Sequence, residues 1–97
     1  MIEGTTYHFS EDKNKILKET RGISFEEIIF LIEGDCILDV IENPSPKYAH
    51  QKIYVIDVGG YAYAVPCVVK GNVIFLKTIH ASRDLNKKYK DKLGGKK

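Results

Sequence analysis

Polar and aromatic residues alternate over Thr5–Phe9, which predicts a short first strand. Apolar residues at helical spacing follow this segment. A helix over residues 11–19 is expected next, with Ser10 as its N-cap, because a serine hydroxyl accepts a hydrogen bond from a free N–H of the first turn. The helical periodicity places Ile16 and Leu17 on the core side of this helix.

A second helix is indicated by a capping box, in which Ser24 is the N-cap and Glu27 follows three residues later. Its apolar stripe consists of Phe25, Ile28, Ile29 and Ile32. Gly22 suits the left-handed residue that ends the preceding helix, and Gly34 ends the second one. The two helices are therefore expected to form a helical hairpin.

The middle of the chain has the pattern of a β-sheet. Strands are predicted over Cys36–Ile41, Lys52–Val58, Tyr61–Val69 and Val73–His80. Gly59 and Gly60 predict a tight hairpin. Pro66 predicts an irregularity or an edge in its strand, because proline has no N–H for the ladder. The nearly continuous apolar character of Val73–His80 favours the centre of the sheet for that strand.

The last predicted element is a lysine-rich helix over Arg83–Leu93, with Ser82 as its N-cap. The element order predicts an α+β fold, in which two N-terminal helices and a basic C-terminal helix pack on one face of an antiparallel β-sheet meander. Residues 1–93 are expected to form a single domain, and residues 94–97 a flexible basic tail.

The composition is that of one soluble globular domain, since 43% of the 97 residues are apolar and 29% are charged. The net charge of +2 is unevenly placed. Residues 1–76 carry 7 Lys/Arg against 11 Asp/Glu, whereas residues 77–97 carry 8 against 2. A basic segment attracts polyanions by releasing condensed counterions, although a solvated lysine-rich tail has the same composition.

The sequence lacks the features that several classes of protein require. The apolar runs fall short of the roughly 20 residues of a membrane span, and no signal peptide is visible, so a cytoplasmic protein without membrane contact is expected. Cys36 and Cys67 match neither a metal spacing nor a disulfide framework and are expected to be buried thiols. No cofactor or metal is expected, because ligand-spaced clusters and a glycine-rich phosphate loop are missing from the sequence.

Three segments occur in the order typical of one protein family: Phe9–Lys15, Arg21–Glu27 and Lys77–Arg83. With a tyrosine in the last helix, they resemble the BrnT-type toxins of bacterial type II toxin–antitoxin systems over about residues 7–90. The chain departs from the family pattern at Arg21, where histidine is common, and at His80. The resemblance implies a RelE-like fold, a metal-independent endoribonuclease acting on mRNA, free or on the ribosome, and a DNA-binding antitoxin that neutralises it.

Candidate site residues follow from the chemistry of RNA cleavage by the ribose 2′-hydroxyl, which requires stabilisation of a phosphorane and two proton transfers. Arginine offers a fork of donors to phosphate, lysine a point charge, and histidine an acid or base near neutral pH. The predicted catalytic residues are Arg83, which matches the strand-end arginine of the family, Lys77, Lys52, His80 and Tyr89. The predicted RNA-binding residues are Lys87, Lys88, Lys90 and His50.

Each candidate also has a structural interpretation. Arg83 and Lys52 have the sequence context of ordinary surface residues. Lys77 has the context of a lysine whose apolar stem lies along the strand while its ammonium group reaches water. Tyr89 has the context of a residue that packs the last helix on the sheet. The alternative function is accordingly a non-catalytic module that binds nucleic acid or protein through the basic helix. The nuclease hypothesis requires Arg83 and at least one ammonium group to meet in one open hollow.

Overall fold

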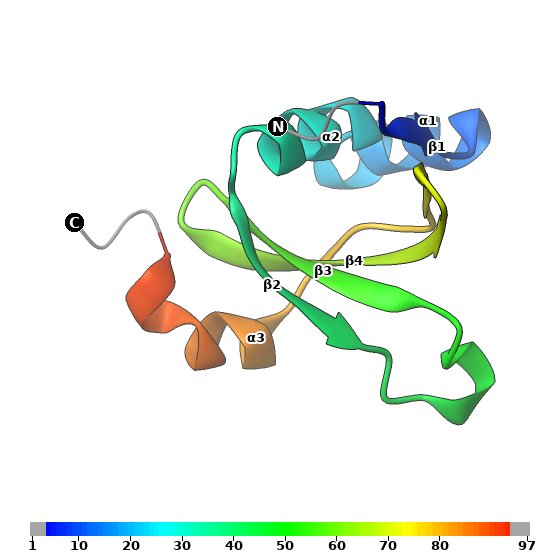
Figure 1. Ribbon diagram of the computed structural model, residues 1–97. Coiled ribbons are helices and arrows are strands. Elements are labelled where there is room, and N and C mark those ends of the chain that lie inside the picture. The colour runs from blue at the N-terminus through cyan, green and yellow to red at the C-terminus, as the bar shows by residue number, and fades with distance from the viewer. Residues whose placement is uncertain (1–3, 94–97) are drawn as a thin grey trace.

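The computed structural model describes residues 4–93, which form a mixed β-sheet with helices on both of its faces (Figure 1). The strands in this range are β1 (Thr6–His8), β2 (Ile37–Glu42), β3 (Lys52–Val58), β4 (Tyr61–Lys70), β5 (Val73–Leu76) and β6 (His80–Ala81). The helices are α1 (Glu11–Arg21), α2 (Phe25–Glu33) and α3 (Arg83–Lys88), with the 3₁₀ helices η1 (Pro46–Tyr48) and η2 (Lys90–Lys92). The predicted α+β class is confirmed.

The centre of the sheet is β4, because the strand order is β1-β5-β4-β3-β2 and β6 also pairs with β4. The expectation that Val73–His80 would form the central strand is therefore wrong. The meander from β2 to β5 is antiparallel as predicted, and Gly59 and Gly60 form its tight hairpin with φ angles of 61° and 92°.

The first strand makes the sheet mixed, since β1 pairs with β5 in parallel. The N–H of Thr6 donates to the carbonyl oxygen of Asn72 over 2.8 Å, and the register then sets Tyr7 beside Ile74. Parallel strands need a long crossover connection, which α1, α2 and the meander provide. The predicted antiparallel meander did not include this first strand, because a three-residue strand gives no signal of the direction of its neighbour.

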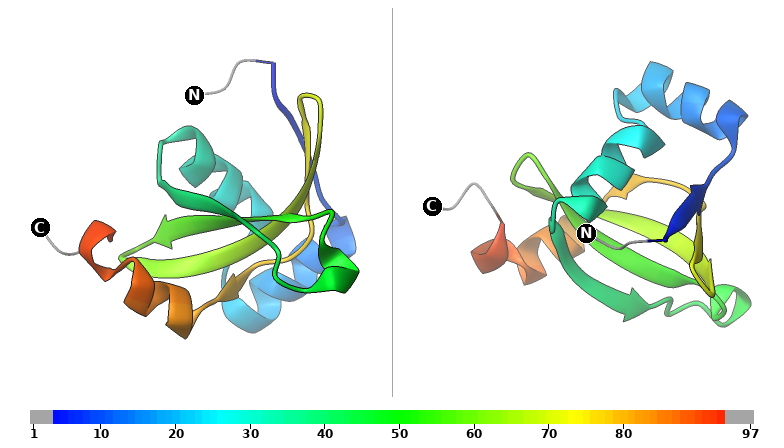
Figure 2. Two further views of the ribbon diagram at one scale, coloured as in Figure 1. Left: turned by 60° about the horizontal axis from the view of Figure 1, so that its bottom comes forward. Right: turned by 45° about the horizontal axis from the view of Figure 1, so that its top comes forward.

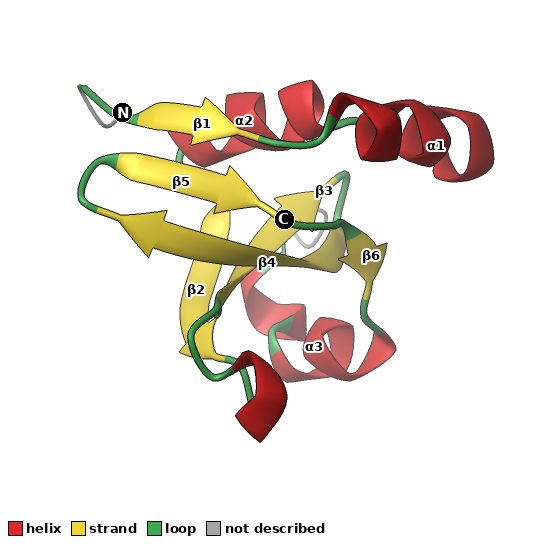
Figure 3. Ribbon diagram, turned by 90° about the vertical axis from the view of Figure 1, so that its right-hand side faces the viewer, coloured by secondary structure: helices red, strands yellow, loops and turns green. Residues whose placement is uncertain are grey.

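The last predicted strand is broken at residues 77–79, so that β5 and β6 are separate strands beside β4 (Figure 3). Pro66 of β4 lies opposite the break and has no N–H to donate. The N–H of Lys77 still donates to the Pro66 carbonyl oxygen over 2.9 Å. The irregularity predicted at Pro66 is confirmed, and it leaves Lys77 and Thr78 outside the regular sheet.

The helices cover both faces of the sheet, which corrects the expectation that they share one face. Leu17 of α1 and Phe25 of α2 are buried against one face, whereas Tyr89, after α3, packs on the other. In the right-hand view of Figure 2, α3 lies apart from α1 and α2. Strand alternation explains how the sheet serves both layers, because the neighbours Val55 and Ile56 are fully buried in different clusters.

The helix caps are those that the sequence predicts. The hydroxyls of Ser10, Ser24 and Ser82 each accept a hydrogen bond from the backbone N–H three residues later. Gly22 follows α1 with a φ angle of 67°, a left-handed conformation that glycine adopts without a steric penalty.

Two details of the helices differ from the prediction. Ile16 is 54% exposed, because α1 turns Leu17 and not its neighbour toward the sheet. The last helix ends at Lys88 instead of Leu93, since Tyr89 leaves the helical conformation with a φ angle of −106° and η2 follows.

Asn14 joins α1 to the start of α2 and is 2% exposed. Its Oδ1 accepts a hydrogen bond from the N–H of Phe25 over 2.7 Å, and its Nδ2 donates to Oε1 of Glu26 over 2.8 Å. The second bond is the largest cause of a lowered pKa of the Glu26 carboxyl. The predicted helical hairpin is thus held by a buried amide as well as by apolar contacts.

The remaining predictions concern the cysteines, the tail and the membrane. Cys67 is fully buried, and burial raises the pKa of its thiol to about 12, whereas Cys36 is only half-buried. The predicted basic tail, residues 94–97, lies outside the described residues. None of the helices between residues 4 and 93 has the length and apolar content needed to cross a membrane.

Candidate functional site

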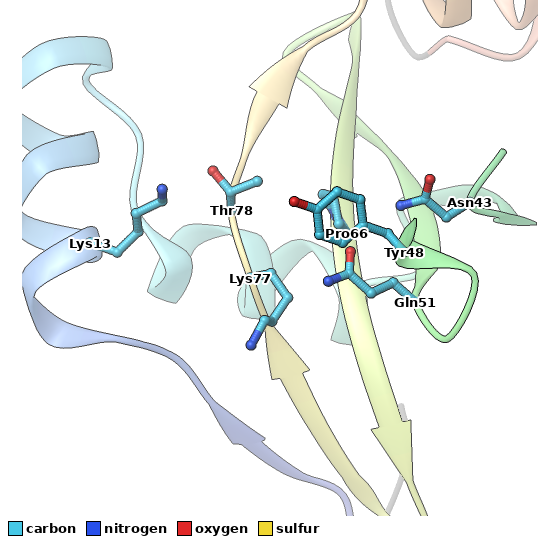
Figure 4. A pocket seen from close by; sticks show the side chains of 7 residues that line it. All are labelled: Lys13, Asn43, Tyr48, Gln51, Pro66, Lys77 and Thr78. Carbon is cyan, nitrogen blue, oxygen red and sulfur yellow. The ribbon is translucent and has the colours of Figure 1, made fainter. Parts of the chain in front are cut away.

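Two hollows open beside the segment in which β5 breaks before β6. The first, the lysine hollow, has a volume of about 350 Å³ and is shown in Figure 4. It is lined by Lys13, Asn43, Tyr48, Gln51, Pro66, Lys77 and Thr78. The second, the histidine hollow, has a volume of about 360 Å³ and is lined by Arg21, Tyr63, His80 and Ala81. The broken strand therefore supplies side chains to both hollows.

The lysine hollow carries positive charge that no acidic side chain in its lining offsets. Lys13 comes from the first turn of α1 and Lys77 from the break, and both side chains are exposed. Neither ammonium group forms an ion pair with a residue of the described range. Cations without acidic neighbours in a concave site raise the local concentration of anions, so this hollow is suited to a phosphate group.

Gln51 places a buried amide at the lysine hollow. It is 8% exposed, and its backbone N–H donates to the carbonyl oxygen of Tyr48 over 2.9 Å. Its side-chain amide makes no hydrogen bond with another described residue. Figure 4 shows Gln51 and Tyr48 reaching from the β2–β3 connection toward Lys77 and Thr78. The amide atoms are not sealed from solvent, because the buried side-chain nitrogen or oxygen that lacks a partner among the described residues is the Tyr7 hydroxyl, so the Gln51 amide is open to a ligand in the hollow.

Tyr48 and Asn43 add an aromatic ring and a second amide to the lysine hollow. The Tyr48 side chain is 43% exposed at the end of η1, and the Lys47 ammonium lies 5.6 Å from the centre of its ring. The Oδ1 of Asn43 accepts a hydrogen bond from the N–H of Ser45 over 3.0 Å, which orients the amide. Exposed aromatic rings beside cations stack on nucleobases in single-stranded nucleic acids.

The histidine hollow brings α1, β4 and β6 together. Arg21 spans the gap, because its Nη1 donates to the carbonyl oxygen of Ile79 over 2.8 Å. Burial, and then the charge of Arg21, lower the pKa of His80 below its ordinary value of 6.5. The imidazole is therefore neutral at neutral pH and able to accept a proton.

The predicted catalytic residues do not converge as expected. Lys77 lines the lysine hollow and His80 the histidine hollow, so the structure places them at neighbouring but different sites. Arg83 is the exposed first residue of α3 and lines neither hollow. The expected meeting of Arg83 with an ammonium group is thus not found in either hollow, so a phosphate site in a hollow has to use other cations, which are Lys13 and Lys77 in one and Arg21 in the other.

Other predicted residues lie outside the two hollows. Lys52 forms an ion pair with Glu42, its partner across β2 and β3, so its charge is largely neutralised by a neighbour. His50 is exposed in the loop before Gln51 and lines neither hollow. The exposed lysines of the C-terminal region also line neither hollow: Lys87, Lys88 and Lys90.

Tyr89, a predicted catalytic residue, packs on the sheet instead. It is 6% exposed, and its hydroxyl donates a hydrogen bond of 2.5 Å to Oδ2 of Asp39. This bond raises the pKa of Tyr89 and is the largest cause of a lowered pKa of Asp39. The ammonium groups of Lys88 and Lys92 lie 5.5 Å and 6.0 Å from its ring centre. These contacts support the interpretation that Tyr89 packs the last helix on the sheet.

Replacing Tyr89 with phenylalanine is expected to destabilise the protein near neutral pH and to have little effect in strong acid. The lost hydrogen bond holds the pKa of Asp39 below its ordinary value of 3.8. The stability it contributes is therefore present above that pH and is lost as the pH falls through the lower folded-state pKa. Urea unfolding of both proteins at about pH 6 and about pH 2 measures the difference. The control is Tyr61→Phe at an exposed hairpin tyrosine, and an equal loss at both pH values would contradict the prediction.

Seven polar residues of these linings were not predicted as site residues: Lys13, Arg21, Asn43, Tyr48, Gln51, Tyr63 and Thr78. A weak signal existed for Arg21, which departs from the family pattern. A tyrosine and two amides in the loop between two strands formed a further signal, because polar aromatic loops on a rigid sheet often bind ligands.

Comparison of the chain with protein-family models, with curated proteins and with solved structures finds no match. The described residues contain no group of three or more His, Cys, Asp or Glu side chains placed to hold a metal ion. The two hollows and the residues that line them are therefore the features of the molecule that bear on its function.

Proposed function

We propose that the chain is a metal-independent endoribonuclease that acts as the toxin of a type II toxin–antitoxin system, with a RelE-like arrangement of helices and sheet. The observation that carries this proposal is the lysine hollow, whose lining combines two lysines without an acidic ion-pair partner among residues 4–93, the exposed ring of Tyr48 and the amide of Gln51. Cations bind phosphate and aromatic rings stack on bases, so the hollow has the two parts that single-stranded RNA requires.

In this proposal the scissile phosphodiester lies against Lys77, with Lys13 as a second cation. The backbone N–H of Lys77 donates to the carbonyl oxygen of Pro66, which limits the movement of the Cα atom that carries the lysine side chain. A nucleobase stacks on Tyr48, and the unpartnered amide of Gln51 bonds to the edge of that base or to the ribose.

The reaction uses the cations of the chain. The 2′-hydroxyl attacks the adjacent phosphorus and the 5′-oxygen leaves, so that the products carry a 2′,3′-cyclic phosphate and a 5′-hydroxyl. Negative charge increases on the phosphorane oxygens, and the ammonium groups of Lys77 and Lys13 stabilise it. The 2′-hydroxyl gives its proton to a water molecule in the open hollow, and the leaving 5′-oxygen takes a proton from the Tyr48 hydroxyl or from an ammonium group, which solvent then protonates again.

The toxin role rests on the resemblance to the BrnT-type family. The segments that carry the resemblance contribute Lys13, Arg21, Lys77 and His80 to the two hollows. A DNA-binding antitoxin would neutralise such an enzyme in the cytoplasm by covering the hollows, because masking the cations removes their attraction for mRNA.

The purified chain is expected to cleave single-stranded RNA in the presence of a metal chelator and to leave 2′,3′-cyclic phosphate ends. Electrophoresis of an end-labelled RNA, with enzymatic analysis of the new ends, measures this result. The Lys77→Met protein, prepared in the same way, controls for a contaminating nuclease. RNA that binds in a salt-dependent manner but stays intact would instead support the non-catalytic interaction module and contradict the nuclease.

A further inference from the structure

The histidine hollow supports an inference that rests on the proposed function and extends it along the RNA. We propose that this hollow binds the phosphate group adjacent to the one in the lysine hollow, so that the chain holds two successive phosphates along residues 77–81. Nothing in the chemistry of cleavage requires this second site, since the reacting phosphate lies in the lysine hollow.

The lining of the histidine hollow is suited to an anion. Arg21, His80 and Tyr63 supply its polar side chains, and the lining contains no carboxylate. One guanidinium nitrogen of Arg21 bonds to Ile79, which leaves the other donors of the planar fork for a ligand. Arginine binds phosphate oxygens through two parallel hydrogen bonds, and these are among the strong hydrogen bonds of proteins.

The guanidinium group is held in place before any ligand binds. The bond from Arg21 to the Ile79 carbonyl joins residues 58 positions apart and is 2.8 Å long. Gly22 ends α1 directly after Arg21, so the arginine is carried by the last turn of a capped helix. A group that is already ordered loses little conformational entropy on binding, which favours affinity.

The spacing of the two hollows fits neighbouring phosphates. Lys77 and His80 are three residues apart, and an extended chain covers at most about 11 Å over that distance. Successive phosphates of a nucleic-acid strand are about 3.4 Å apart along the axis when the strand is stacked and further apart when it is extended, so a single nucleotide step can join the two hollows. A strand that lies along the broken β5–β6 connection would therefore reach both hollows.

His80 provides a readout of phosphate binding. The charged and titratable groups of its hollow are Arg21 from α1 and Tyr63 from β4, and Arg21 disfavours the imidazolium form. A bound phosphate would place negative charge beside the imidazole and raise its pKa. His8 and His50 lie outside this hollow and serve as internal references.

The test uses the full chain and two probes. Inorganic phosphate is titrated while NMR follows the imidazole signals, and the His80 signals are expected to move with a raised pKa while those of His8 and His50 stay unchanged. The second probe is a 2′-O-methyl dinucleotide, which cannot be cleaved, with or without an added 5′- or 3′-terminal phosphate. One of the two added phosphates is expected to raise the affinity about 10-fold or more.

Arg21→Gln is expected to abolish that gain and the phosphate response of His80. His80→Gln, as a second variant, is expected to reduce the gain. The matched control is Lys15→Gln, which removes a positive charge from α1 outside both hollows. It is expected to keep the native gain.

The outcomes separate this inference from the proposed function. If the dinucleotide binds but neither added phosphate raises its affinity and His80 does not respond, the second phosphate site is wrong while the proposed function stands. If no oligonucleotide binds and RNA is not cleaved, the proposed function is wrong, and the inference fails with it.

Discussion

Replacing Lys77 with methionine is expected to lower the rate of RNA cleavage by about 10²–10³-fold, the effect of removing one preorganised charge-stabilising group. Methionine keeps an unbranched apolar stem but has no ammonium group to stabilise the phosphorane. Lys77 is exposed and has no ion-pair partner in the described range, so the change leaves no buried charge behind. Single-turnover cleavage at saturating RNA measures the chemical step apart from binding.

The matched control is Lys70→Met, which removes a lysine at the exposed end of β4, outside both hollows. This variant is expected to cleave at the native rate and to unfold at the native temperature. A Lys77→Met protein that keeps the full native rate would show that the reacting phosphate does not lie beside Lys77.

Replacing Asn14 with alanine is expected to lower the free energy of unfolding by about 3 kcal/mol. The change leaves the N–H of the fully buried Phe25 without its acceptor, and Glu26 without its donor. An orphaned buried donor costs its desolvation, and the deleted side chain adds a cavity between α1 and α2. Urea unfolding followed by circular dichroism measures the loss.

The control for this change is Asn72→Ala, because Asn72 is exposed and donates to Gly4 at the surface. Its effect is expected to stay within about 0.5 kcal/mol, as for ordinary surface positions. Asn14→Asp adds a second test, since it keeps the acceptor for Phe25 but puts a carboxylate beside Glu26. A loss of less than 1 kcal/mol for Asn14→Ala would contradict the role of the buried amide.

The starts of the three α-helices, and the end of α1 at Gly22, could be predicted because their causes are local. The Ser24 hydroxyl accepts from a backbone N–H three residues away, and Gly22 relieves a steric conflict within its own residue. The bounds of β3, Lys52–Val58, agree with the prediction, because the alternating pattern of the strand is followed directly by the two glycines that end it. Each of these signals is complete within a few residues.

The errors in the fold arise from contacts that are distant in the sequence. The apolar run Val73–His80 gave no sign of its break, because the break depends on Pro66 of the neighbouring strand. The face chosen by α3 depends on Tyr89 reaching Asp39, 50 residues earlier. Burial in these cases is decided by which elements meet, and the local pattern does not contain that information.

The candidate site was predicted in part. Residue chemistry and the resemblance selected Lys77 and His80, which both line hollows. They also selected Arg83 and Tyr89, although α3 carries the first away from both hollows and buries the second on the sheet. Gln51 was not predicted as a site residue, because the sequence does not show that this loop amide lies at a hollow beside Lys77.

The sequence by itself determined the α+β class, the N-caps of the three α-helices, the hairpin at Gly59 and Gly60, and the irregularity at Pro66, because these features follow from steric limits and hydrogen bonds within a few residues. The tertiary structure decided the strand order, the two helix layers and the lining of the hollows. Lys13, Gln51 and Lys77 are separated by 38 and 26 positions, and only the packing of α1 and the β2–β3 connection around the broken strand brings them together.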